Sequence, residues 1–328
     1  MTQEELFKHI ISHCKEYGFV FPSSEIYEGL GAVYDYGPYG VELKNNIREY
    51  WWKSMVQMND NIVGLDASIF MHPAVWKASG HVDAFSDPLI DNKDSKKRYR
   101  ADELIENKVA QYTKKGKTDK ADALLKNLDE CIKTGNLKGL KALIDEHEIV
   151  CPESGSRNWT EVRQFNLMFG TKMGSVTEES DEIFLRPETA QGIFVNFLNV
   201  QKTSRKKIPF GIAQIGKAFR NEIVARQFIF RMREFEQMEM QFFVKPGEEL
   251  KWFEYWKNER MKWHKKIGTA ENKLRFHEHT KLAHYANAAF DIEYEFPMGF
   301  KEVEGIHSRT DLDLKQHEQF SGKKLQYF

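Results

Sequence analysis

The sequence predicts an α+β fold in which one domain is interrupted by a helical insertion. Residues 1–90 and 153–328 are rich in aromatic residues and contain the short alternating patterns that are typical of strands. Residues 91–152 are instead highly charged and poor in aromatic side chains. Strand and helix patterns do not alternate in the order that a βαβ repeat requires. We therefore expect a domain in two parts, 1–90 and 153–328, with the insertion between them.

The overall composition excludes several classes of protein. The 328 residues carry 48 Lys and Arg against 49 Asp and Glu, so the chain is not a globally cationic nucleic-acid coat, although a local basic groove stays open. We expect no secretory signal and no membrane span, because the first residues are mixed and acidic and no long apolar run occurs.

The three cysteines, Cys14, Cys131 and Cys151, are scattered along the chain. They do not suggest a disulfide scaffold, and we expect a reducing, cytoplasmic location. Cys151 begins a segment in which Ser154 stands where a Cys-x-x-Cys pair would have its second ligand. Zinc needs about four ligands, so no zinc is expected there.

The first part of the domain is expected to contain two helices joined by a glycine-dense turn. The first helix is predicted over residues 4–17, and the turn covers residues 29–40. Apolar side chains then recur at helical spacing over residues 41–58, which predicts an amphipathic helix. We interpret it as a core-packing helix, although its Trp51 and Trp52 also suit an oligomer contact.

The insertion is expected to be helical. Residues 91–150 contain 14 Lys and Arg, 12 Asp and Glu and only two aromatic residues. Its apolar residues follow a helical period: Leu124, Leu125, Leu128, Ile132, Leu137, Leu140 and Leu143. A solvated helical pair is the favoured interpretation, and a role in gripping nucleic acid is the alternative.

The second part of the domain contains the residues that suggest chemistry. Helices are predicted near 189–200 and 248–267, and residues 212–222 form a predicted strand. Alternation places these side chains on one face of that strand: Ile212, Gln214, Gly216, Ala218, Arg220 and Glu222. Its small residues predict open space above the sheet. The segment 230–243 is expected to be the next strand, with Phe235, Gln237, Glu239 and Gln241 aligned.

An antiparallel hairpin of these strands, in a suitable register, would gather Arg220, Glu222, Phe235 and Glu239 on one surface. Guanidinium groups bind phosphate oxygens, a phenyl ring stacks on a purine, and carboxylates accept from an amine or chelate magnesium. The set therefore predicts a nucleoside triphosphate site. The alternative is a surface hairpin with solvated salt bridges, which explains the charges but not the small residues beside them.

Five motifs resemble one enzyme family. Residues 219–222 (FRNE) followed by 230–235 (FRMREF) resemble the motif 2 hairpin of class II aminoacyl-tRNA synthetases. Further motifs resemble the glycyl-tRNA synthetases of the homodimeric type: 34–40 (YDYGPYG), 76–81 (WKASGH), 185–194 (LRPETAQGIF) and 235–239 (FEQME). A short Arg-x-Glu would be a weak signal, but this ordered series runs through essentially the whole chain.

The resemblance implies a six-stranded antiparallel sheet flanked by helices, and a ligase that uses glycine, ATP with Mg²⁺, and tRNA(Gly). Glycyl-adenylate forms first, and glycine then passes to the 3′ end of the tRNA. The glycine carboxylate itself attacks phosphorus, so no side-chain nucleophile or protein base is needed. The family also implies a homodimer built around the motif 1 segment near Pro38.

The resemblance assigns the ATP site residue by residue. Arg220 would hold the α-phosphate, Glu222 the adenine amino group and Arg231 the terminal phosphate, which makes these three the catalytic residues. Phe235 would stack on adenine. The full set of expected ATP contacts is Arg220, Asn221, Glu222, Phe230, Arg231, Met232, Arg233, Glu234, Phe235, Glu302 and Val303.

The amino-acid pocket and the metal site follow from the same resemblance. The expected substrate contacts are Arg100, Glu188, Phe235, Glu236, Gln237, Met238 and Glu239. Carboxylates suit the ammonium group of glycine, although Glu188 at a helix start would also be a good cap. Glu302 is the expected Mg²⁺ ligand. Alternation places Glu304 on the same strand face, as a helper or simply as an edge-strand charge.

Two departures from the family pattern matter. Val224 and Ala225 stand where the family often has Ser-Pro. We also find no motif 3 and no anticodon-binding domain within the 328 residues, so we expect an amino-terminal portion with little or no aminoacylation activity by itself. A non-catalytic paralogue or accessory subunit is the alternative reading, although such proteins commonly lose the arginine and carboxylates that are present here.

Overall fold

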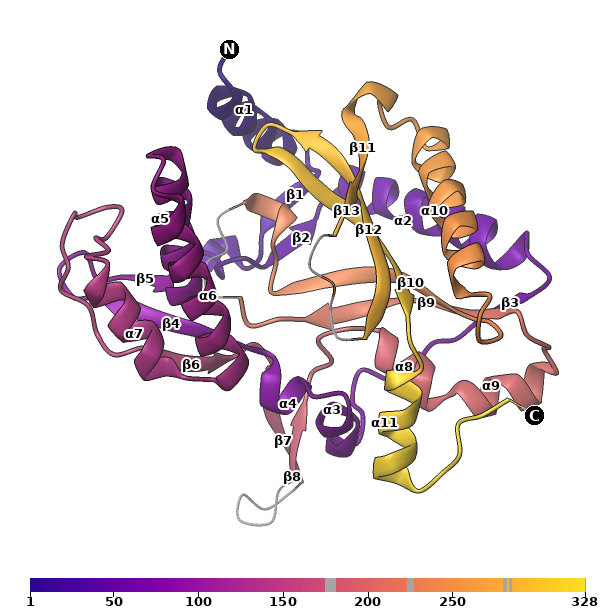
Figure 1. Ribbon diagram of the computed structural model, residues 1–328. Helices are drawn as coiled ribbons and strands as arrows, with labels where there is room; N and C mark the ends of the chain where they lie inside the picture. Colours follow the sequence, from indigo (N-terminus) through magenta and orange to yellow (C-terminus); the bar gives the residue numbers. More distant parts are fainter. Residues whose placement is uncertain (175–180, 223–226, 280–281, 283–284, 328) are drawn as a thin grey trace. The chain divides into compact units, whose positions relative to one another are not determined.

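The computed structural model describes residues 1–174, 181–222, 227–279, 282 and 285–327 (Figure 1). They group into two compact units. The first contains Met1–Ser79, Gly170–Arg220 and Gln227–Phe328, and the second contains Gly80–Phe169 with the described part of 221–226. The predicted insertion lies inside the second unit. Helices and mainly antiparallel sheets occur in both units, which confirms the α+β prediction.

The second unit is a group of helices beside a small sheet. Its strands β4 (Ser86–Asn92), β5 (Lys97–Arg100) and β6 (Arg163–Asn166) pair antiparallel in the order β5-β4-β6. Its helices are α4 (His81–Ala84), α5 (Ala101–Lys114), α6 (Thr118–Thr134) and α7 (Leu137–Glu146). Three helices therefore follow β5, where the sequence predicted a pair.

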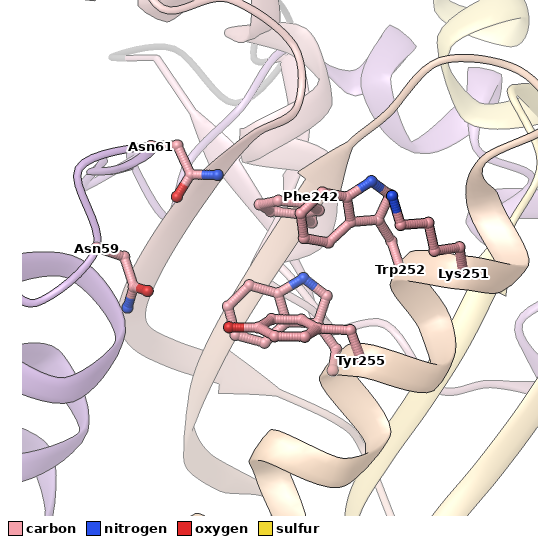
Figure 2. Close-up of a pocket in the computed structure, with 7 residues that line it drawn as sticks. Asn59, Asn61, Phe242, Lys251, Trp252 and Tyr255 are labelled. Carbon is pink, nitrogen blue, oxygen red and sulfur yellow. The ribbon is translucent and has the colours of Figure 1, made fainter.

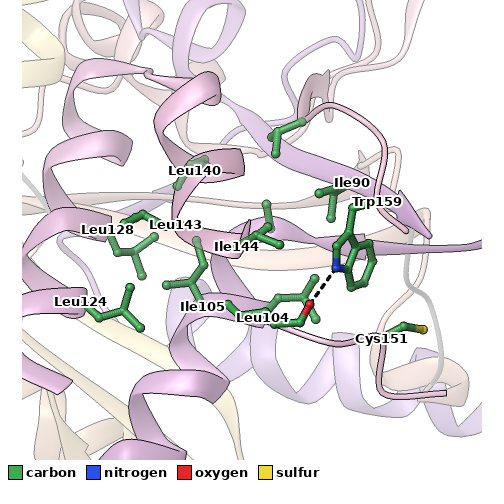
Figure 3. Packing of buried hydrophobic residues seen from close by; sticks show 13 residues of the cluster. Ile90, Leu104, Ile105, Leu124, Leu128, Leu140, Leu143, Ile144, Cys151 and Trp159 are labelled. Atoms are coloured by element: carbon green, nitrogen blue, oxygen red, sulfur yellow. Dashed lines mark hydrogen bonds between the residues drawn. The ribbon is translucent and has the colours of Figure 1, made fainter. Parts of the chain in front are cut away.

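Side chains from these three helices form one hydrophobic core (Figure 3). Leu124 and Leu128 of α6 are buried, whereas Leu125 is 41% exposed on the same helix. The indole Nε1 of Trp159 donates a hydrogen bond of 2.8 Å to the backbone oxygen of Ile149. The apolar period predicted the helices correctly, but only the packing distinguishes inner from outer leucines.

The first unit begins with the elements predicted for residues 1–90. Helix α1 (Gln3–Glu16) confirms the first helix, and β1 (Val20–Pro22) pairs antiparallel with β2 (Tyr34–Tyr36). Helix α2 (Pro38–Trp52) starts three residues before the predicted range, because proline is well suited to a first helical turn. A π-helical segment, Lys53–Gln57, continues it. Strand β3 (Ile62–Gly64) and helix α3 (Pro73–Ala78) follow.

The glycine-dense segment allows α2 to start against neighbouring backbone. A β-carbon on Gly40 would lie 1.9 Å from the carbonyl oxygen of Phe19, and one on Gly37 would lie 2.3 Å from that of Gly18. No side chain fits at either position. These glycines are required by the close approach of two backbone segments.

The central hairpin consists of β9 (Phe210–Phe219) and β10 (Glu234–Phe243). They pair antiparallel without interruption, from Glu234 opposite Phe219 to Phe243 opposite Phe210. Strand β3 lies on the other side of β9 and runs parallel to it. One face of this sheet packs on apolar residues of α2 and of helix α10 (Glu249–Lys266).

A second sheet consists of β11 (Leu274–Glu278), β12 (Ala286–Phe296) and β13 (Gly299–Arg309), all antiparallel. Helix α10 (Glu249–Lys266) packs against β12 and β13 (Figure 1). In the described part of the first unit, these strands and the hairpin form separate three-stranded sheets. This differs from the single six-stranded antiparallel sheet that the resemblance implied.

The remaining elements surround the hairpin. They are β7 (Gly170–Met173), β8 (Asp181–Phe184), α8 (Ala190–Val195), α9 (Phe197–Ser204) and α11 (Leu312–Ser321), with single 3-10 turns at Glu25–Tyr27, Phe228–Phe230 and Glu271–Lys273. The helix predicted over 189–200 is divided at Asn196, whose side chain donates to the Gly192 carbonyl at 2.9 Å. Among the described residues, no helix is both long enough and apolar enough to cross a membrane.

A bulge in β13 reverses one prediction. Glu293 pairs with Glu302 and the adjacent Ile292 pairs with Glu304, so Val303 is an extra residue in the strand. Because neighbouring residues of β12 face opposite sides, Glu302 and Glu304 also face opposite sides. The prediction that they share a face was wrong, because simple alternation does not allow for a bulge.

Glu304 has a structural environment on the α10 side. Its carboxylate accepts a hydrogen bond of 2.6 Å from Nε of the buried Arg260 and lies 2.8 Å from Nε2 of His264. Burial by itself raises the pKa of Glu304, but the hydrogen bond with His264 and the charge and hydrogen bond of Arg260 outweigh it and lower the pKa. The ionised carboxylate therefore stabilises the fold.

We predict that Glu304→Gln lowers the free energy of unfolding at pH 7 by about 3 kcal/mol, because Arg260 loses its charged partner. A lowered pKa means that the contribution is complete above the unfolded value of about 4.3 and is lost as the pH falls through the lower, folded value. Urea unfolding should show a constant difference from wild type near neutrality that shrinks below about pH 4.

The matched control is Glu254→Gln on α10, the helix that carries Arg260 and His264. Glu254 forms an ion pair with Lys257, and its side chain is 57% exposed. An exposed pair contributes at most about 1 kcal/mol, so this variant should unfold nearly as wild type does. Equal losses in the two variants would contradict the assignment of Glu304.

Candidate active site

The polar face of the β9–β10 hairpin is the floor of the candidate active site. Phe235 lies opposite Ala218, Gln237 opposite Gly216, and Glu239 opposite Gln214. Alternate residues of a strand share a face, so these pairs lie in one row. The antiparallel hairpin was predicted with its register left open, and the observed register aligns Phe235 and Glu239 with the small and polar residues of β9.

Arg220 lies at the end of this row, beside Phe235. Its guanidinium carbon is 5.2 Å from the centroid of the Phe235 ring, and its Nε donates to the Pro187 carbonyl at 3.1 Å. The backbone N–H of Arg220 donates to the Arg233 carbonyl at 2.9 Å. A fixed cation next to an aromatic face suits a ligand that combines a phosphate with a flat ring.

Glu302 lies on β13 and is exposed. Local desolvation and the negative charge of Asp291 raise the pKa of Glu302, while the charges of His279 and Arg220 act in the opposite direction. Val303 is also exposed, as the extra residue of the bulge.

A carboxylate pair, Glu188 and Glu239, lies further along the hairpin. The Thr189 hydroxyl donates to one oxygen of Glu239, and Gln241 Nε2 donates to the other at 2.7 Å. Burial and the nearby charge of Glu188 raise the pKa of Glu239, against the opposing hydrogen bonds from Thr189 and Gln241. The structure thus brings together the two predicted substrate carboxylates.

Glu188 belongs to a network that the sequence did not predict. Gln191 donates through Nε2 to Glu188 at 2.9 Å and to Asp313 of α11 at 3.1 Å. His317 Nε2 lies 2.8 Å from the Gln191 carbonyl oxygen, and Arg309 donates to Asp313 at 2.6 Å. Gln191 lies inside one of the recognised motifs, but its partners on α11 have no local signal, because only tertiary packing brings them near.

Arg186 packs on this face of β9, over Gly216. It is 2% exposed, and it donates to the carbonyls of Lys217 and Ala67 at 2.6 and 2.7 Å. A β-carbon on Gly216 would lie 2.1 Å from its Nη2. The space that the small residue was expected to leave open is therefore filled, at Gly216, by this guanidinium. Desolvation lowers the pKa of Arg186, partly offset by Asp66 and Glu239.

Two predicted substrate residues face away from this row. Glu236 makes an ion pair of 2.7 Å with Lys44 of α2, and Met238 packs into the apolar cluster around Trp51 and Met55. Alternation puts both side chains on the opposite side of β10 from Phe235. Contacts from them to a ligand over Phe235 would have to come from backbone atoms.

The other predicted ATP residues of the first unit surround the start of β10. Arg233 donates to the Gly31 carbonyl at 3.0 Å, and Glu234 pairs with Lys217 at 2.6 Å. The Phe230 ring packs edge-on against Phe296, with 5.3 Å between centroids. Met232 is half-buried in the same segment, while Arg231 is exposed.

Three predicted residues belong to the second unit. Arg100 donates to Asp102 at 2.5 Å and lies 3.2 Å from Asp87, and these contacts outweigh desolvation and raise its pKa. The backbone N–H of Asn221 donates to the Leu167 carbonyl at 2.8 Å, and Glu222 is half-buried. The departure from the family pattern at Val224 and Ala225, like Arg226, lies outside the described residues.

An aromatic cavity of about 250 Å³ lies on the other face of the hairpin (Figure 2). It is lined by Asn59, Asn61, Phe242, Lys251, Trp252, Tyr255 and Trp256. Phe242 alternates with Phe243 and faces the same way as Met238. The cavity is therefore separate from the row that contains Phe235 and Glu239.

Comparisons with known proteins agree with this geometry. Residues 169–326 match the model of the tRNA synthetase class II core domain (G, H, P, S and T), and residues 87–122 and 115–167 match glycyl-tRNA synthetase insertion domain 1. The chain is 55% identical over 320 residues to a glycine–tRNA ligase of Chlorobaculum tepidum, covering 97% of this chain and 68% of that protein.

Two further relatives show the same relation. A glycine–tRNA ligase of Geobacillus thermodenitrificans is 54% identical over 99% of this chain and 66% of its own length, and that of Macrococcus caseolyticus is 55% identical over 99% and 68%. The chain belongs to the glycine–tRNA ligase family. It spans about two thirds of the length of these relatives.

Family membership confirms the predicted enzyme class, a ligase with a class II synthetase core. The core match contains both strands of the hairpin and the sheet with Glu302, and the insertion matches fall within the second unit. The predicted boundaries 91–152 and the individual ligand contacts stay predictions.

We predict that Gly216→Ala disturbs the glycine–tRNA ligase site without removing any polar group. The added methyl group would collide with the Arg186 guanidinium and displace a buried charge from its carbonyl partners. We expect a loss of about 1–3 kcal/mol in unfolding free energy, together with weaker ATP binding by calorimetry. Gly31→Ala is the control, because its methyl group would meet only an Arg233 side-chain atom at 3.7 Å. Wild-type behaviour of Gly216→Ala would refute the supporting role of Arg186.

Proposed function

We propose that the chain provides the activation site of an enzyme that activates glycine with ATP to form glycyl-adenylate and transfers the glycyl group to tRNA(Gly). The observation that supports this most directly is the row on the hairpin. It begins with Arg220 beside the Phe235 ring and ends at the two carboxylates Glu188 and Glu239. One end suits a nucleotide and the other suits an ammonium group.

The nucleotide end would bind ATP. Phe235 would stack on the adenine, and Arg220, whose Nε and backbone N–H are fixed by hydrogen bonds, would contact the α-phosphate. Arg231 is exposed and would reach the terminal phosphate, while Glu222 would accept from the adenine amino group. Phe230, Arg233 and Glu234 make protein contacts that hold the start of β10 beside these groups.

Mg²⁺ fits the exposed carboxylate of Glu302. This hard cation prefers oxygen ligands and usually keeps several waters, so a single protein carboxylate with the phosphate oxygens is a suitable donor set. When bound, Mg²⁺ would offset phosphate charge. Glu302 also experiences the charge of Arg220, which relates the predicted metal ligand to the predicted α-phosphate ligand.

The carboxylate pair of Glu188 and Glu239 would bind glycine through its ammonium group. Glu239 is held by Thr189 and Gln241, and Glu188 by Gln191, so both carboxylates have fixed positions before a ligand arrives. A nearby ammonium charge would also relieve the repulsion that raises the pKa of Glu239. Glycine has no side chain to grip, so exclusion of larger amino acids would rely on steric clash.

The chemical step would need no protein nucleophile. A carboxylate oxygen of glycine attacks the α-phosphorus, a new P–O bond forms, and the bond to the β-phosphate bridging oxygen breaks to release pyrophosphate. Arg220 would stabilise the charge that develops on the α-phosphate oxygens. The enzyme would act through positioning and electrostatics.

The homodimer and the cytoplasmic location stay predictions, as does low aminoacylation activity of the 328 residues by themselves. A non-catalytic paralogue remains the second candidate. Arg220 beside the Phe235 ring and the Glu188–Glu239 carboxylate pair favour the enzyme, because both are retained in a folded arrangement. Glycine-dependent ATP–pyrophosphate exchange by this 328-residue chain measures activation directly, and robust exchange would refute the expected low activity.

We predict that the chain binds a nonhydrolysable glycyl-adenylate analogue and that Arg220→Ala weakens binding about 100-fold, because a charge-assisted phosphate contact is lost. Isothermal titration calorimetry measures this. The control is Arg205→Ala, an exposed arginine at the end of α9. Absence of binding by the folded wild-type chain would favour the non-catalytic paralogue. Equal affinity of Arg220→Ala and wild type would contradict the assigned role of Arg220.

A further inference from the structure

Two histidines and an aspartate converge on the sheet β11-β12-β13. His279 directly follows β11, Asp291 lies in the middle of β12, and His307 lies on β13. One potential ligand atom from each lies within 4.8 Å of the others. None of the three is assigned above to ATP, glycine or Mg²⁺.

The strand register explains why these side chains meet. The backbone N–H of His279 donates to the Ala289 carbonyl at 3.1 Å, and Ala289 pairs with His307, so these residues form one row across the sheet. The next row on the same face contains Asp291 paired with Gly305. Ala289 and Gly305 are small, which leaves room between the three polar side chains.

Asp291 presents an oxygen that has no protein partner in the described part of the chain. Its side chain is 9% exposed, and Oδ2 lies 2.7 Å from His279 Nε2. No described residue donates a hydrogen bond to Oδ1. Burying a carboxylate oxygen without a hydrogen-bond partner costs free energy, so a bound ligand at this atom would stabilise the protein.

Atoms of His307 and Asp291 surround the position that a side chain of Gly305 would occupy. A β-carbon built there would lie 3.3 Å from His307 Nε2 and 3.6 Å from Asp291 Oδ1. Glu302 Oε1 would lie 3.2 Å from the same point. A hydrogen bond between His279 and Asp291 alone would explain one contact, but neither the position of His307 nor the second oxygen of Asp291.

We propose that His279, Asp291 and His307 form a binding site for a divalent transition-metal ion, and that Zn²⁺ fits it best. Two imidazole nitrogens and one carboxylate oxygen are typical zinc ligands, whereas Mg²⁺ prefers oxygen alone. Three protein ligands leave at least one position open, and Glu302 is near enough to share it. His307 is exposed, so an ion can enter from solvent.

Binding would connect the three strands that form the sheet beneath Glu302. The metal would take the place of the proton between His279 and Asp291, so the imidazole would carry its proton on Nδ1 and offer Nε2 to the ion. The unpartnered oxygen of Asp291 would gain a cation. This inference does not depend on the proposed synthetase activity, because the site is defined without ATP or glycine.

The test uses the metal-free, tag-free chain of 328 residues without nucleotide. Calorimetric titration with Zn²⁺ should show one site, and His279→Ala and His307→Ala should each weaken it at least about 100-fold. Gly305→Ala should also weaken it, because its methyl group would occupy the space between the ligands. The matched control is His277→Ala, an exposed histidine on β11 whose ring centroid is 5.9 Å from that of His279.

Other outcomes would overturn the proposal. One is an unchanged Zn²⁺ affinity in His307→Ala, a variant that should fold because the side chain is exposed. Another is a loss of Zn²⁺ affinity in His277→Ala as large as that in His279→Ala. Titration with Co²⁺ gives a second measurement, because a thiolate charge-transfer band would place the ion at a cysteine instead. Equal affinity for Mg²⁺ and Zn²⁺ would also contradict a nitrogen-containing site. Any of these results would leave adenylate-analogue binding, and therefore the proposed function, untouched.

Discussion

The buried guanidinium of Arg186 is the interaction on which the candidate active site depends. It donates to the carbonyls of Ala67 and Lys217, and it occupies the volume that the missing side chain of Gly216 leaves. A buried charge is tolerable only where hydrogen bonds replace its water. Arg186 therefore ties the segment after β3 to β9. Gln214, which accepts from the Ala67 N–H at 3.1 Å, lies opposite Glu239 and continues the same support toward the carboxylate pair.

The two faces of β10 have different roles. Phe235, Gln237 and Glu239 face the candidate ligands, while Glu236 and Met238 face α2 and the apolar cluster. One strand thus builds the site and anchors it to the core at alternate positions. Local sequence shows the alternation, but which face is functional depends on what packs against the other.

In the second sheet, a single extra residue in β13 places two neighbouring carboxylates on opposite faces. Because Val303 is inserted at a bulge, Glu302 is exposed on one side while Glu304 pairs with Arg260 and His264 of α10 on the other. One acidic residue is available to a cation and the other stabilises the helix–sheet contact. The two carboxylates look equivalent in the sequence, and their distinct roles arise from the strand geometry.

Sequence alone determined the α+β class, the helical insertion, the two strands of the hairpin and the family, because alternation, helical period and long motifs are local properties of the chain. It did not determine that Arg186 fills the space at Gly216, or that Gln191 connects Glu188 to α11. Nor did it group His279 with Asp291 and His307. Those contacts join residues that are distant in the sequence, so only the tertiary structure decided them.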